Sequence, residues 1–171
     1  MWRRIFTHAI FIVALNILGL LDFKATSAKT NISEIKIEKI GTVYLPWGLA
    51  ILNPYEVLVT TKIGKLFLFN LDKNTKTLVS GTPRSAFYRQ GGLLDVATQK
   101  RHDGNYVFLC YSKLTANKNL TVAISKSKLF GNKLIETRDI FTSNHMSKSG
   151  VHFGCRLALD DLHLFASLGD R

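Results

Sequence analysis

Short runs of apolar and β-branched residues recur along most of this chain, and polar turns separate them. This pattern limits the fold more than any other feature of the sequence. We expect strands at residues 35–40, 47–52, 57–61, 65–70, 93–97, 106–111, 120–127, 138–141, 155–159 and 162–167. Short strands at such spacing are typical of a β-sandwich, a β-barrel or a β-propeller. The sequence therefore predicts an all-β fold.

A weak internal sequence repeat favours the propeller among these folds. Three segments, starting at Gly48, Gly92 and Arg156, each contain an apolar strand, a polar turn and a second apolar strand. The spacing between the first two starts agrees with a propeller blade period of about 40–50 residues. The spacing to the third start also agrees if a loop is inserted between the segments. An ordinary antiparallel meander would also give this repeat. At this blade size, the part of the chain after residue 28 is long enough for about three blades.

The first 28 residues have the pattern of a targeting segment. Arg3 and Arg4 precede an apolar stretch over residues 5–21, and the small residues 25–28 follow it. A basic start, an apolar centre and a small-residue exit are typical of a secretory signal peptide. We therefore expect a signal helix over residues 1–28, a propeller domain over residues 29–171, and a periplasmic or secreted protein. An uncleaved anchor helix is the alternative.

The chain is basic, with 23 Lys and Arg residues against 12 Asp and Glu residues and a net charge of +11. Such a charge could attract nucleic acid or anionic lipid. The lysines are scattered rather than gathered in one run, which favours a solvated basic surface. We expect no nucleic-acid partner, and membrane contact only through the signal segment. The two cysteines, Cys110 and Cys155, exclude a disulfide-dense scaffold, and they are either paired or free thiols.

Two segments contain residues suited to chemistry. Gln90 precedes a pair of glycines, which allow a tight turn or the close approach of a ligand. His152 and Arg156 lie four residues apart where a loop enters a strand. A neutral histidine there can accept a proton near pH 7, although a structural histidine would give the same spacing.

A third segment, Gly169-Asp170-Arg171, follows the last expected strand. It could bind a polar ligand, and a plain turn with an ion pair is the simpler interpretation. The remaining histidines and the two cysteines do not have the spacing of metal ligands, so we expect no metal site built from them.

Together these segments resemble the soluble quinoprotein sugar dehydrogenases, and most closely the aldose sugar dehydrogenases of the glucose/sorbosone dehydrogenase family. The segments QGGLLD at 90–95 and HFGCRL at 152–157 are the specific ones. Weaker matches, in family order, lie at residues 45–50, 58–60, 64–66, 96–97, 107–112 and 168–171. Cys155 stands where this family usually has Gly or Ser.

The resemblance implies a six-bladed β-propeller that binds pyrroloquinoline quinone (PQQ) and calcium and oxidises the C1 hydroxyl of an aldose to a lactone. It implies that His152 is the general base, and that Gln90 and Arg171 lie near the cofactor. It assigns no calcium ligand in this chain.

About three blades leave such a ring incomplete. We therefore expect a truncated enzyme that is inactive alone. The alternative is a partial propeller that acts as an exported binding module and self-associates through open blade edges.

Overall fold

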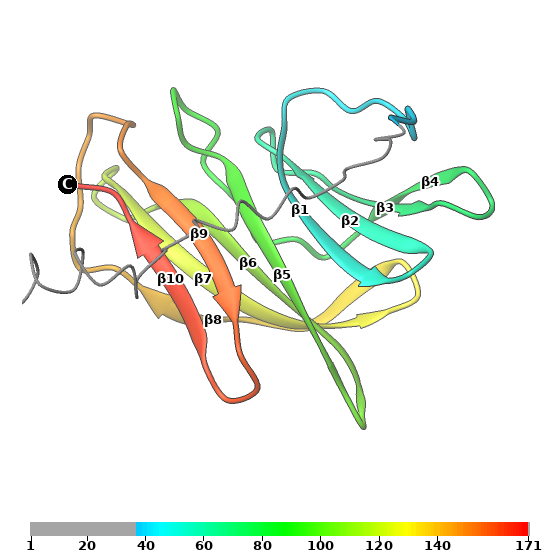
Figure 1. The fold of residues 1–171 in the computed structure, drawn as a ribbon. Helices are drawn as coiled ribbons and strands as arrows, with labels where there is room; N and C mark the ends of the chain where they lie inside the picture. The colour runs from blue at the N-terminus through cyan, green and yellow to red at the C-terminus, as the bar shows by residue number, and fades with distance from the viewer. Residues whose placement is uncertain (1–36, 171) are drawn as a thin grey trace, which may run out of the picture. The chain divides into compact units, whose positions relative to one another are not determined.

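The computed structural model describes residues 37–170, and over that range it contains ten β-strands in three antiparallel sheets (Figure 1). Contacts divide the chain between Glu38 and Lys39, so all ten strands belong to one unit. The first sheet contains β1 (Pro46–Asn53), β2 (Glu56–Thr61), β3 (Leu66–Asn70) and β4 (Thr75–Val79). The second contains β5 (Leu93–Arg101), β6 (Gly104–Leu114), β7 (Leu120–Phe130) and β8 (Lys133–Thr142). The third contains β9 (Gly154–Leu159) and β10 (Leu164–Leu168).

The prediction of an all-β fold is confirmed. Each strand pairs with the next one along the chain, so both four-stranded sheets are meanders of the form found in propeller blades. Nine of the expected strands are present, and β4 is an additional strand that the sequence pattern did not indicate. Within residues 37–170 the structure has no helix long and apolar enough to span a membrane.

The predicted strand at residues 35–40 is wrong for its described part. Residues 37–40 lie in no strand, and Ile37 is 92% exposed. An alternating pattern forms a strand only where a neighbouring strand pairs with it and a core covers its apolar side. Over residues 37–170 the structure supplies neither to this segment. The expected signal segment, residues 1–28, and Arg171 lie outside the described residues.

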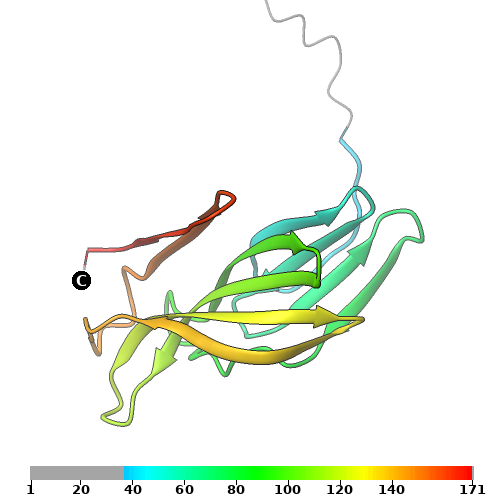
Figure 2. The same ribbon diagram turned by 90° about the horizontal axis from the view of Figure 1, so that it is seen from below.

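Two hydrophobic cores separate the three sheets. The first contains buried residues of the two four-stranded sheets, such as Leu58 and Leu66 from one sheet and Val107 and Leu109 from the other. The second lies between the β5–β8 sheet and the β9–β10 hairpin, which forms a layer of its own in the turned view of Figure 2. Strands β5, β6 and β7 of the central sheet are therefore buried on both faces over much of their length, whereas β8 is largely exposed.

The sequence of β6 explains this burial. Residues 107–112 are all buried, although side chains alternate between the two faces of a strand. Val107 and Leu109 enter the first core, whereas Phe108 and Cys110 enter the second. A continuous apolar run of this kind requires a covering layer on each face.

Thr60 of β2 joins the first sheet to β5. Its side chain is fully buried, and its hydroxyl donates to the backbone oxygen of Leu94 at 2.5 Å and accepts from the backbone N–H of Gly48 at 2.8 Å. Gly48 has no space for a side chain, because a Cβ atom there would lie 2.7 Å from a carboxylate oxygen of Asp95. The hydroxyl therefore holds two backbones in close contact beside the start of β5.

We expect Thr60→Val to destabilise the protein by about 1–3 kcal/mol, because it leaves a buried N–H and a buried carbonyl without their shared partner. Thr60→Ser keeps the hydroxyl and should lose much less stability. Urea unfolding followed by tryptophan fluorescence measures both variants. Equal stability of the Val and Ser variants would contradict this role of the hydroxyl.

Candidate functional site

His152 lies in the loop that leads from β8 into β9, and the backbone of this loop has an unusual conformation. His152, Gly154 and Cys155 have φ values of +59°, +67° and +79°. This left-handed region favours glycine and is costly for other residues. Two non-glycine residues adopt it here, so contacts with the surrounding structure must hold the loop in place.

Gln90 supplies the first of these contacts. Its side-chain oxygen accepts a 2.8 Å hydrogen bond from the backbone N–H of His152, and its own backbone N–H donates to the carbonyl of Gly150 at 2.9 Å. The adjacent Arg89 donates from its guanidinium to the carbonyl of Ser149 at 3.0 Å. The structure thus joins the two sequence segments that contain Gln90 and His152, which lie 62 residues apart.

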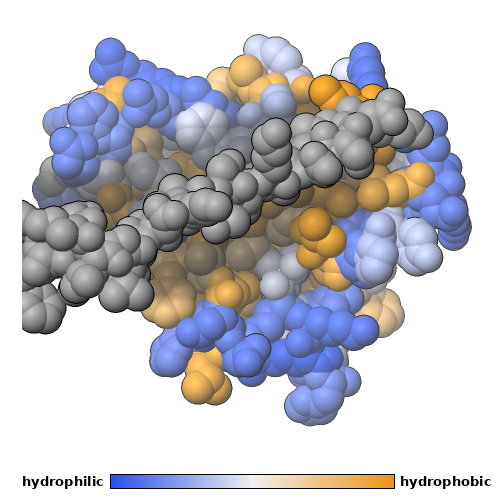
Figure 3. All heavy atoms as spheres, in the orientation of Figure 1, coloured by the Kyte–Doolittle hydropathy of each residue, from blue (hydrophilic) through white to orange (hydrophobic). Residues whose placement is uncertain are grey.

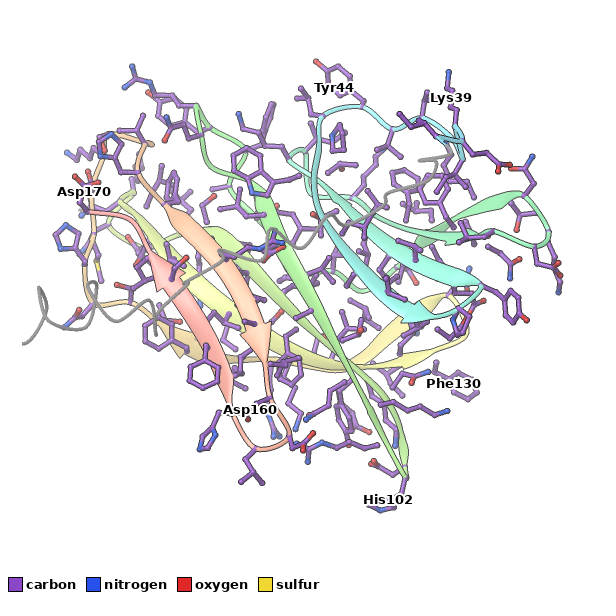
Figure 4. The ribbon with its side chains drawn as sticks, viewed as in Figure 1. Lys39, Tyr44, His102, Phe130, Asp160 and Asp170 are labelled. Carbon is purple, nitrogen blue, oxygen red and sulfur yellow. A yellow bond between two sulfur atoms is a disulfide. The ribbon has the colours of Figure 1, made fainter. Side chains whose placement is uncertain are left out.

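Asp170 supplies the second contact, to the imidazole itself. Its carboxylate lies 3.0 Å from Nδ1 of His152. The two side chains are 56% and 93% exposed, so both are open to solvent. The backbone brings them together, because the N–H of Gly169 donates to the carbonyl of Phe153 at 3.1 Å. Figure 4 shows Asp170 at the upper left of the view, away from Asp160 and His102 at its lower edge.

The partnership between Asp170 and His152 was not identified from the sequence, which left Asp170 as a ligand or a plain turn residue. Eighteen positions separate the two residues, and only the pairing of β9 with β10 makes them neighbours. No sequence signal marks this contact. Arg171, the third expected site residue, lies outside the described residues.

A disulfide is the third contact that holds the loop. Cys110 of β6 and Cys155 of β9 are bonded, with Cα atoms 5.8 Å apart, and both are buried in the second core. The bond attaches the chain to the central sheet three residues after His152. The pairing, which the sequence left open, is thereby settled for these two residues.

The side chain of Asp95 holds the start of β9 by binding the backbone of that strand. Its carboxylate is 3% exposed, accepts from the N–H of Leu157 at 2.7 Å, and lies 3.5 Å from the guanidinium of Arg156. The sequence signal for this role was a single carboxylate inside the apolar run of β5, which sequence reasoning did not use. A buried carboxylate requires such partners. Arg156 therefore acts as an ion-pair partner here.

The resulting arrangement suits proton transfer. A carboxylate that accepts the Nδ1 proton fixes one tautomer of the imidazole and leaves Nε2 free to accept a proton. Among residues 37–170, no three His, Cys, Asp or Glu side chains group as a metal site.

Comparison with known proteins links this fold to one family. Residues 43–171 match the family model described as Glucose / Sorbosone dehydrogenase. An uncharacterized protein of Synechocystis is 33% identical over 153 residues, which are 83% of this chain and 37% of that protein. The aldose sugar dehydrogenase of Escherichia coli is 30% identical over 130 residues, which are 73% of this chain and 35% of that protein. This chain thus spans little more than a third of either curated relative.

Two solved structures share the fold. The apo form of the soluble E. coli aldose sugar dehydrogenase superposes with a TM-score of 0.65 at 30% identity, over 73% of this chain and 38% of that one. The PQQ-bound form of an aldose sugar dehydrogenase from Streptomyces coelicolor superposes with a TM-score of 0.55 at 21% identity, over 71% and 36%. The four-stranded antiparallel sheets described above match those of these dehydrogenase structures.

Replacing both cysteines with serine should destabilise the protein by about 2–4 kcal/mol, since the disulfide closes a loop between residues separated by 45 positions. Urea unfolding with and without a reductant measures the loss. The reductant should lower the midpoint of the parent protein and leave the double serine variant unchanged. A parent midpoint that does not respond to reduction would contradict the role of the bond.

Proposed function

This chain belongs to the glucose/sorbosone dehydrogenase family, and on that premise we propose that it acts in PQQ-dependent oxidation of an aldose at C1. The observation that carries the proposal is the solvent-exposed imidazole of His152, whose Nδ1 lies 3.0 Å from the carboxylate of Asp170 and whose backbone is held by Gln90. The name of the E. coli relative, an aldose sugar dehydrogenase, supports the substrate class.

In this proposal His152 is the general base. Nε2 of the neutral imidazole accepts the proton of the C1 hydroxyl, and the carboxylate of Asp170 stabilises the imidazolium that results. The hydrogen on C1 leaves as hydride with its electron pair, so the C1–OH group becomes the carbonyl of a lactone. PQQ, when bound, supplies the two-electron acceptor. Gln90 has the supporting role, because its side-chain oxygen fixes the backbone of the base.

Next to His152, the proposed general base, the side chains present are suited to contact PQQ. The oxygen of the Gln90 carboxamide is already used by His152, which leaves its NH2 group to donate to a quinone or carboxylate oxygen. Arg171 is proposed as a further cofactor contact on resemblance alone. The S. coelicolor protein of the same fold was solved with PQQ bound, which supports the cofactor. Calcium is proposed for the family site without any ligand from residues 37–170.

We further propose a six-bladed ring as the architecture of the complete site, since this chain spans little more than a third of its curated relatives. Export to the periplasm or the medium is also proposed. The Cys110–Cys155 disulfide supports export, because such bonds persist in oxidising compartments.

His152→Asn should lower the kcat of dye-linked aldose oxidation roughly 100- to 10,000-fold, the range for loss of a general base. The purified protein is supplied with PQQ and calcium, and turnover is measured with glucose and other aldoses. Asp170→Asn should also lower kcat, by less, because the imidazole loses its orienting partner but remains present.

His102→Asn is the matched control. His102 is an exposed histidine in the turn between β5 and β6, far from Asp170 in Figure 4, and its replacement should leave kcat unchanged. Full activity of the His152→Asn protein would refute the general-base role. A folded parent protein without turnover is the result that an incomplete ring predicts. Sedimentation then separates the two hypotheses, because a monodisperse closed oligomer would favour the exported binding module.

A further inference from the structure

A cavity of about 280 Å³ lies between the central sheet and the β9–β10 hairpin, at the end where β9 turns into β10. It is distant from His152, because Asp160 in this turn and Asp170 lie at opposite ends of the hairpin (Figure 4). Four basic side chains line it: Arg101, Lys126, Arg138 and His163. No Asp or Glu is among its lining residues.

The strand register places two of these cations directly opposite each other. Lys126 of β7 pairs with Arg138 of β8, so their side chains leave the sheet on the same face as close neighbours. Like charges in such a pair destabilise a sheet. Over residues 37–170 neither side chain forms an ion pair with a carboxylate that would offset this cost. An anion bound between them would offset it.

Two of the three nearby carboxylates, those of Asp103 and Asp160, are already used by other groups. Asp103 accepts from the hydroxyl of Tyr106 at 2.6 Å and pairs with Lys128 at 3.2 Å, contacts that lower the pKa of its carboxyl to about 2. Asp160 accepts backbone N–H groups of its own turn and pairs with His163. Glu136 borders a smaller adjoining hollow that also touches Lys126 and Arg138. Glu136 is not among the residues that line the cavity, so Arg101, Lys126 and Arg138 face it with this one carboxylate beside two of them.

The other walls of the cavity are apolar and aromatic. Phe108, Ile140, Leu159 and Leu164 line it, and they continue the second core toward solvent. The ring of Tyr106 lies beside it, with the Lys126 ammonium 4.4 Å from the ring centroid. In Figure 3 hydrophilic residues gather at the lower end of the view, where this turn lies. The cavity therefore combines a cationic wall with an apolar floor.

We propose that this cavity binds a small organic anion, a phosphate or carboxylate carried on an apolar ring or chain. The guanidinium groups of Arg138 and Arg101 suit the two oxygens of such a headgroup, and Phe108 and Leu159 cover its apolar body. The site is separate from the His152 site and does not depend on the proposed reaction.

Titration of the full chain with phenyl phosphate, followed by 15N NMR and calorimetry, tests the proposal. We expect saturable binding, with shifts confined to β5–β8 near the cavity and to the 160–164 turn. Inorganic phosphate and benzoate should bind more weakly, because the first lacks the apolar body and the second carries a single charge. Benzyl alcohol, which is neutral, should not bind.

Arg138→Gln and Lys126→Gln should each weaken phenyl phosphate binding by roughly tenfold. The matched controls are Lys73→Gln and Lys118→Gln, which remove the same charge from exposed turns and should have no effect. Equal weakening by the controls would show that scattered surface charge binds the anion, and this result would overturn the proposal. So would the binding of benzyl alcohol as tightly as phenyl phosphate.

Thermal unfolding separates a ligand site from a structural role. Without an anion, Arg138→Gln should melt at a higher temperature than the parent, since the like-charged pair with Lys126 is gone. Phenyl phosphate should raise the melting temperature of the parent more than that of the variant. The proposal would be overturned if the variant melts at a lower temperature than the parent and phenyl phosphate raises both melting temperatures equally.

Discussion

The burial of β5, β6 and β7 on both faces of the central sheet is the constraint on which the rest of this structure depends. Strands β6 and β7 carry apolar side chains toward both neighbouring layers, so neither face can be left to water. The first sheet covers one face and the β9–β10 hairpin covers the other. The second of these contacts also creates the candidate site, because the loop that precedes β9 must pass the glycine-rich entry of β5, where Gln90 lies.

The same packing explains how an exposed imidazole acquires a defined position. His152 itself has little burial to hold it, and its backbone conformation is unfavourable. The order comes from buried groups that hold the chain just after it: the disulfide at Cys155 and the carboxylate of Asp95, which binds the backbone of Leu157. An exposed acid–base group on a rigid support is the arrangement that proton transfer from a bound substrate requires.

The sequence predicted the parts of this fold that depend on local pattern. The run of β6 and the turns between strands follow from residue type, and nine strands could be anticipated. Strand β4 could not, because Thr75–Val79 is largely polar and exposed and forms a strand through pairing with β3. The strand expected at 35–40 failed for the opposite reason, since its pattern has no pairing partner in the described structure. Contacts between distant residues, such as His152 with Asp170, were beyond local pattern altogether.

The hairpin that covers the central sheet has different chemistry at its two ends. Near Asp170 the disulfide attaches the loop of His152 to the second core, and an apolar hollow lined by Ile124, Ala166 and Leu168 lies along β10. Near Asp160 the core stays open, because Lys126 and Arg138 occupy strand positions that would otherwise extend it. Apolar residues there would add buried area and remove a like-charged pair. Keeping two cations at these positions makes that end of the sheet less stable. Residues that lower stability in this way are typically found where they bind a ligand.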